Sequence, residues 1–170
     1  RNLMGVPVYL ERVTLSFPHL FEKQAPQGTD NLAYSAEFLI DQSDKASLDV
    51  LERAFRSVLT EEGKLDRIAV LKRPWRKGED VNAEAEAKGK NPRPEIVGKV
   101  CVRAKDATYA PAVMDAMAQP IPESKKDLIF GGCIVNASFD LYWSRNAANP
   151  GVYAGLRGVQ LVDNVNVKRV

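Results

Sequence analysis

The feature that most constrains this chain is a two-residue alternation of apolar and polar side chains over several short segments. Such alternation places successive side chains on opposite faces of a β-strand and buries one of the faces. The segments are 6–17, 33–40, 98–105, 133–143 and 152–162. In the first, Val13, Leu15 and Phe17 are expected to face the core. The Phe17-Pro18 step should end that strand, because proline cannot continue a hydrogen-bonded ladder.

Only one long segment has the period of an amphipathic helix. Apolar residues recur there every three or four positions, Leu51 and Val58 among them, which predicts a helix from about Asp44 to Glu62. Asp44, or the serine before it, is a suitable N-cap, and Gly63 is a suitable stop.

Five strands with one helix inserted between early strands predict a mainly β fold, a small, partly open antiparallel barrel. The five-stranded OB-fold is the natural candidate, and a β-sandwich is the alternative because periodicity alone does not separate the two. We expect residues 1–170 to form a single domain. At 45% hydrophobic residues, the chain can bury a core without disulfides or a metal.

Two long connections separate the predicted strands. Residues 72–97 contain three prolines, two glycines, many charges and few aliphatic side chains, which predicts an exposed basic loop, mobile at about 72–97 until a partner binds. Residues 106–131 predict a second loop with a short helical turn at 111–117.

Cysteine and histidine usage argues against a zinc site. Cys101 and Cys133 lie within predicted strands, outside any C-x-x-C pair, and are expected to be free core thiols in a reducing cytoplasm. A disulfide between neighbouring strands is the alternative. His19 is the single histidine and is expected to pack or cap rather than act as a base. No apolar run reaches membrane-spanning length, and no signal peptide is visible.

No enzyme motif is present. The chain lacks G-x-S-x-G, a P-loop and H-E-x-x-H. Its carboxylates are scattered, and a metal-dependent nuclease would need two or three of them to converge on one cation. We therefore expect no catalysis, and keep a nuclease as a minor alternative that would involve Asp106 or Asp115.

Cations and aromatic residues give the strongest functional signal. The net charge of only +2 is uninformative, so the distribution of charge decides. Lys99, Arg103 and Lys105 share one face of the segment 98–105, with no acid on that strand before its end. The KRPWRK segment surrounds Trp75 with four cations. Charge neutralisation combined with aromatic stacking is how proteins bind single-stranded nucleic acid without sequence preference.

These observations predict a set of nucleic-acid-binding residues, some neutralising phosphates and others stacking on bases. An ordinary solvated strand face and a folded-back tryptophan remain the structural alternatives. The predicted residues are Lys72, Arg73, Trp75, Arg76, Lys77, Lys99, Arg103, Lys105, Tyr109, Tyr142, Trp143 and Arg157.

Several sequence blocks, in their order and spacing, resemble a family of bacteriophage single-stranded-DNA-binding proteins with an OB-fold. The N-terminal blocks are VTLSFPHLFE and YSAEFLIDQSDKASLDVLERA; the C-terminal blocks are DATYAPAVMD, IFGGCIVNASFDLYW and GVYAGLRGVQLV. The resemblance implies a protein that coats single-stranded DNA during phage replication, recombination or repair, in the cytoplasm of the infected bacterial host. It implies no catalysis and no cofactor.

The resemblance also bears on partners. Family members and their relatives often end in an acidic tail that contacts replication proteins of the phage or host, whereas this sequence ends in NVNVKRV, which is basic. A homo-oligomer is compatible with the sequence. The alternative function is a protein-interaction or virion structural module built on a similar barrel.

Overall fold

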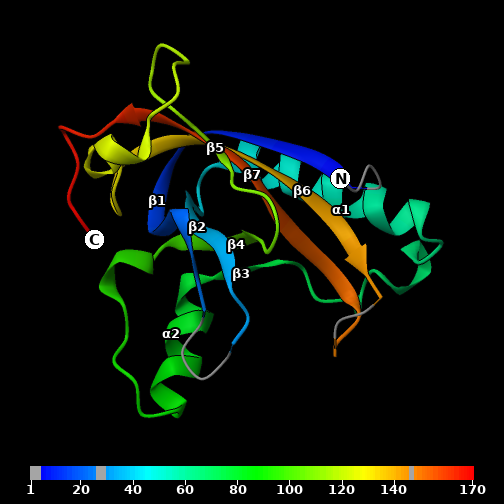
Figure 1. Cartoon of the computed structure of the whole chain (residues 1–170). Coiled ribbons are helices and arrows are strands. Elements are labelled where there is room, and N and C mark those ends of the chain that lie inside the picture. Colours follow the sequence, from blue (N-terminus) through cyan, green and yellow to red (C-terminus); the bar gives the residue numbers. More distant parts are fainter. Residues whose placement is uncertain (1–4, 26–29, 146–147) are drawn as a thin grey trace.

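A five-stranded barrel organises the fold (Figure 1). The computed structural model describes residues 5–25, 30–145 and 148–170. The long strands are β1 (Val6–Gln24), β2 (Ala33–Asp41), β4 (Lys99–Asp106), β6 (Ile134–Ser144) and β7 (Gly151–Asp163). They pair in the order β4-β2-β1-β6-β7, and β4 then pairs with β7 in parallel to close the barrel. This connectivity confirms the OB-fold prediction over the sandwich.

Two short strands extend the sheet, and neither was predicted. β3 (Trp75–Lys77) pairs with β4, and β5 (Ala112–Met114) pairs in parallel with β7. β5 lies where a helical turn was expected at 111–117, so that prediction was wrong. Three residues are too few for a period to be visible, and the hydrogen bonds that define these strands come from distant partners.

β1 continues past Pro18, contrary to the prediction that the strand ends there. The register against β2 shifts between Ser16 and His19, so a bulge accommodates the residue that lacks an N–H. Phe17 lies in this bulge with φ of 43° and is 50% exposed. Its predicted position on the core face was therefore wrong.

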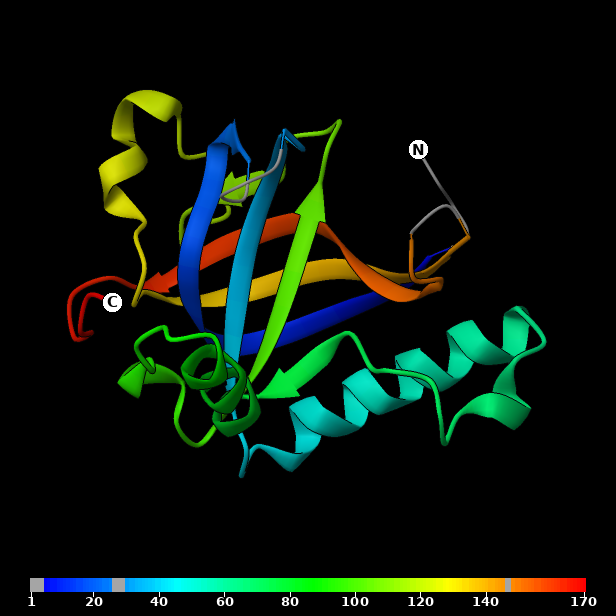
Figure 2. The same cartoon turned by 90° about the horizontal axis from the view of Figure 1, so that it is seen from below.

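The predicted helix is present as α1 (Lys45–Glu61). The Asp44 side chain caps it by accepting a hydrogen bond from the backbone N–H of Ser47 at 3.1 Å. Its buried face, including Leu51 and Phe55, packs against the barrel beside β1 and β6. Figure 2 shows α1 lying along one side of the barrel and α2 near one end of the barrel.

Residues 72–97 contain regular secondary structure, which corrects the prediction of a loop, although most of these residues are exposed, as expected. They form β3, α2 (Gly78–Ala87) and the 3-10 turn η2 (Pro94–Ile96). We call residues 78–97 the insert. Its buried Ile96 packs with Leu39 and Cys101 on the outer face of the barrel, and Val81 packs against this small cluster. Ile96 and Val81 thus supply apolar contacts that dock a segment whose composition resembles a loop.

The main core lies inside the barrel and beneath α1. Phe38 and Phe139 stack there with ring centroids 5.8 Å apart. Cys133 belongs to this core and Cys101 to the cluster under the insert; both thiols are free and buried, as predicted. Burial raises the pKa of the Cys101 thiol to about 11, so it stays protonated at neutral pH.

Candidate nucleic-acid interface

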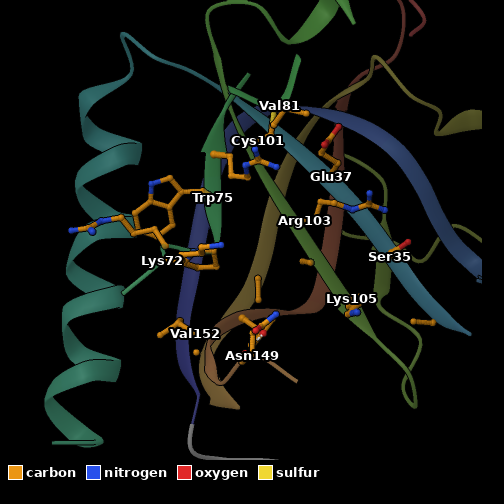
Figure 3. Close-up of a pocket in the computed structure, with 18 of the residues that line it drawn as sticks. Ser35, Glu37, Lys72, Trp75, Val81, Cys101, Arg103, Lys105, Asn149 and Val152 are labelled. Carbon is orange, nitrogen blue, oxygen red and sulfur yellow. Dashed lines mark hydrogen bonds between the residues drawn. The ribbon is translucent and has the colours of Figure 1, made fainter. Parts of the chain in front are cut away.

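A groove of about 770 Å³ runs over the outer face of β2 and β4 (Figure 3). Segment 70–76 forms one wall, and residues 149–154, which include the start of β7, form another. Gln24 and Asn31, from the ends of the β1–β2 connection, also line it. The outer face of the second and third barrel strands, with the loops beside it, is where OB-folds bind oligonucleotides and oligosaccharides.

The floor of the groove consists of two cross-strand pairs. Lys105 lies opposite Ser35, and Arg103 lies opposite Glu37, all four lining the groove. β4 therefore presents Arg103 and Lys105 on one exposed face, as predicted. Lys99, on the same face, lies beyond the groove and pairs with Asp41.

The wall at 72–76 is positioned by α1. Trp75 pairs in register with Val102 of β4, and its ring meets the Phe55 ring edge-on at 5.7 Å. Arg73 lies over the Phe55 ring at 4.9 Å and donates two hydrogen bonds to Glu52, at 2.9 and 3.0 Å. Side-chain hydrogen bonding to Glu52 raises the pKa of Arg73, against the effect of burial. Figure 3 shows the Trp75 ring between α1 and β4, beside the cavity.

Arg76 lines the same groove and forms an ion pair with Glu84 of α2 at 2.5 Å. Glu84 also pairs with Lys88 at 3.0 Å. The guanidinium of Arg76 is thus shared between the groove and an acid of the insert.

Arg93 is a groove residue that the sequence analysis missed. Its guanidinium donates to both oxygens of the buried Glu37, at 2.6 and 3.4 Å, and it also pairs with Glu95 at 3.2 Å. Burial lowers the pKa of Arg93, but the hydrogen bonds and charges of Glu37 and Glu95 outweigh it and raise the pKa overall. In the sequence, only its position between two prolines distinguishes Arg93, and this position does not indicate which residues its side chain contacts.

Tyr153 is the second aromatic residue lining the groove. Its hydroxyl donates to the backbone carbonyl of Asn149, and its ring lies 6.4 Å from that of Tyr142. Tyr142, which was predicted to stack on bases, is the cross-strand neighbour of Tyr153 and does not line the groove. Burial raises the pKa of Tyr142. Tyr153 was not among the predicted binding residues.

The groove brings together six of the twelve predicted residues: Lys72, Arg73, Trp75, Arg76, Arg103 and Lys105. The other six lie outside it: Lys77, Lys99, Tyr109, Tyr142, Trp143 and Arg157. Arg157 donates to Asp106 and Asp140, both at 2.8 Å, in a largely buried cluster. Trp143 packs against the core with the Lys64 ammonium 5.2 Å from its ring centroid.

The groove is electropositive. Among the described residues that line it, six are lysine or arginine and one, Glu37, is acidic. His19 lies beside this surface, opposite Ser35 across the strands, and its pKa is lowered by burial and then by the charge of Arg103. Within the described ranges, no three His, Cys, Asp or Glu side chains come together as a metal site. No helix in those ranges is long and apolar enough to cross a membrane.

A closed OB barrel with a basic, aromatic groove on its second and third strands is typical of proteins that bind nucleic acids. The family described as the ssDNA-binding protein of Enterobacter phage Enc34 matches residues 6–166 of this chain. The chain therefore belongs to that family. A search of curated protein sequences found no match.

Solved structures show the same fold. The single-stranded DNA-binding protein from bacteriophage Enc34 in complex with ssDNA superposes with a TM-score of 0.76 at 16% identity, covering 95% of this chain and 88% of that one. A C-terminal truncation of the Enc34 protein gives 0.75 at 18% identity, with the same coverage of both chains. The single-stranded DNA-binding protein gp2.5 of bacteriophage T7 gives 0.57 at 12% identity, again over 95% and 88%.

Proposed function

We propose that this protein binds single-stranded DNA in the groove with little sequence preference, and coats it during phage DNA replication, recombination or repair. The observation that carries the proposal is the coincidence of six cations and two aromatic rings in one groove at the oligonucleotide-binding position of an OB-fold. Membership of a family described as ssDNA-binding supports it.

The groove residues divide into two roles. Lys72, Arg103 and Lys105 neutralise phosphates, because within the described chain none of them is paired with a carboxylate. Trp75 and Tyr153 stack on bases. Stacking tolerates any base, which accounts for weak sequence preference, and it requires an unpaired base face, which favours single strands over duplex.

The protein acts in this proposal as a binding protein without catalysis or cofactor. Its place of action is the cytoplasm of the infected host, where phage DNA is replicated. Replication proteins of the phage or host are the expected partners, and self-association on DNA is compatible with the proposal.

Tryptophan fluorescence tests the proposal directly. The protein is titrated with an unstructured thymidine oligomer and with a duplex of equal length, at two salt concentrations. We expect quenching by the single strand, less by the duplex, and weaker binding at high salt. Trp75→Phe should remove most of the quenching, whereas the matched variant Trp143→Phe should retain it, since Trp143 lies outside the groove.

The absence of any fluorescence or anisotropy response to either nucleic acid would refute the proposal. A protein-interaction or virion structural module would then be the function to pursue. Magnesium-dependent cleavage of the oligomer by the pure protein would instead indicate a nuclease.

A further inference from the structure

The guanidinium of Arg93 has almost no free edge. A guanidinium carries five N–H donors, and in Arg93 four hydrogen bonds run from its nitrogens to Glu37, Glu95 and Ser16. A phosphate is bound through these edges. Arg93 is therefore a poor phosphate ligand, although it lines the groove and carries a positive charge.

The backbone of Arg93 is held as firmly as its side chain. The amide of the buried Asn82, on α2, accepts a hydrogen bond from the Arg93 N–H at 2.8 Å and donates one to its carbonyl at 2.9 Å. The insert thus holds the guanidinium against the barrel before any ligand arrives. Such preorganisation lowers the entropy cost of binding.

What remains of Arg93 for a ligand is the flat face of its guanidinium. The group lies over the ring of Phe17, 4.5 Å from the centroid, and its side chain is 24% exposed. Guanidinium planes and aromatic rings are the surfaces on which proteins stack unpaired bases.

Phe17 itself is unusual. A positive φ is rare for a bulky residue and costs free energy, and residues held in this way cluster at functional sites. The conformation keeps a large apolar ring half-exposed, next to the groove, instead of in the core. Burial in the core does not stabilise this arrangement, and the exposed ring is available for contact with a ligand.

We propose that Arg93 and Phe17 form a second base-stacking platform, which extends the groove across β1. The proposal rests on the proposed binding of single-stranded DNA. Trp75 on β3 and Phe17 on β1 are separated by β4 and β2. Three strand spacings amount to about 14 Å, several times the roughly 3.4 Å rise of one nucleotide in a stacked strand. The platform therefore holds a different base from the one on Trp75.

The platform differs from the phosphate-binding cations in one measurable respect. Because Glu37 and Glu95 already engage the charge of Arg93, a variant that keeps this charge but loses the flat face should weaken binding without changing the salt dependence. Phe17→Leu, which removes the ring but keeps an apolar side chain, should lower affinity for a long thymidine oligomer about tenfold, as for one stacked base. The log–log salt slope should stay at the wild-type value.

Tyr9→Ala is the matched control, since Tyr9 is a similarly exposed aromatic residue of β1 that pairs with β6, away from the groove. Thermal unfolding confirms that each variant is folded. A reporter variant, Phe17→Trp in a Trp75→Phe, Trp143→Phe background, should be quenched by the oligomer. Arg93→Lys keeps the charge but loses the planar face, and should behave as Phe17→Leu does.

The outcomes separate this inference from the proposed function. If wild-type protein binds the oligomer, but Phe17→Leu and Tyr9→Ala bind equally well and the reporter is not quenched, the platform is refuted and the groove assignment stands. A reduced salt slope in Arg93→Lys or Phe17→Leu would also overturn it. If wild-type protein does not bind at all, the proposed function itself fails.

Discussion

Replacing Arg103 and Lys105 with alanine is the sharpest test of the groove, because both cations lie on its floor and are free to meet phosphates. Their neighbours across the strand pairs are Glu37, which is engaged by Arg93, and Ser35. Binding of a single strand releases counterions from each phosphate that is neutralised. The logarithm of the binding constant therefore falls with the logarithm of salt concentration by about 0.7 per contact.

The structure sets the expected magnitude. The double variant Arg103→Ala, Lys105→Ala should lose two contacts, which flattens the slope by about 1.4. Arg73 and Arg76 already pair with carboxylates, so their loss should change the slope less. Because both replaced side chains are exposed on the sheet surface, the fold should be retained.

Fluorescence anisotropy of a labelled thymidine oligomer over a series of salt concentrations measures this slope. The control variant Lys125→Ala, Lys126→Ala removes the same charge from η3 (Glu123–Leu128), whose residues do not line the groove. It should keep the wild-type slope. An unchanged slope in the Arg103, Lys105 variant, or an equal loss in the control, would show that this face does not carry the phosphate contacts.

Three further predictions concern the insert, the barrel and the balance of charge. Gly78→Ala should destabilise the protein by about 1–3 kcal/mol in urea unfolding, because a Cβ there would overlap a backbone carbonyl of η2. The pKa of Asp106 lies below its ordinary value of 3.8 because, against the effect of burial, backbone N–H groups and Arg157 hold the carboxylate. Its contribution to stability should be complete above that value and lost below it, so Asp106→Asn should destabilise at neutral pH and much less in acid. Glu84→Gln frees Arg76 and should raise DNA affinity and steepen the salt slope in the anisotropy assay.

The sequence was sufficient for the five long strands because alternation over eight or more residues reports burial on one face, whereas closure of the barrel depends on the pairing of β4 with β7. It also located α1, whose cap and apolar stripe are local features. It failed at Phe17, since the bulge that turns this ring outward depends on pairing with β2. It failed for residues 78–97 because docking depends on Ile96 meeting Leu39 and Cys101, which are distant in the chain.

The candidate site was only partly visible for the same reason. Periodicity identified Arg103 and Lys105, and composition identified Trp75. The three-dimensional pairing decides which cations are available, and no local pattern reports that Arg157 is tied to Asp106 and Asp140. Arg93, by contrast, was not predicted but lines the groove, since only the fold brings it to Glu37.

The distribution of acids around the groove explains how a chain of net charge +2 can present a basic surface. The carboxylates that pair with Arg73 and Arg76 come from α1 and α2, behind the side chains that they hold. A paired arginine gains little free energy from binding a phosphate, because it exchanges one anionic partner for another. Its side chain is, however, already oriented before DNA binds. The unpaired cations gain the full counterion release. On this argument, salt dependence reports on Lys72, Arg103 and Lys105, whereas the paired arginines fix the shape of the groove against which the bases stack.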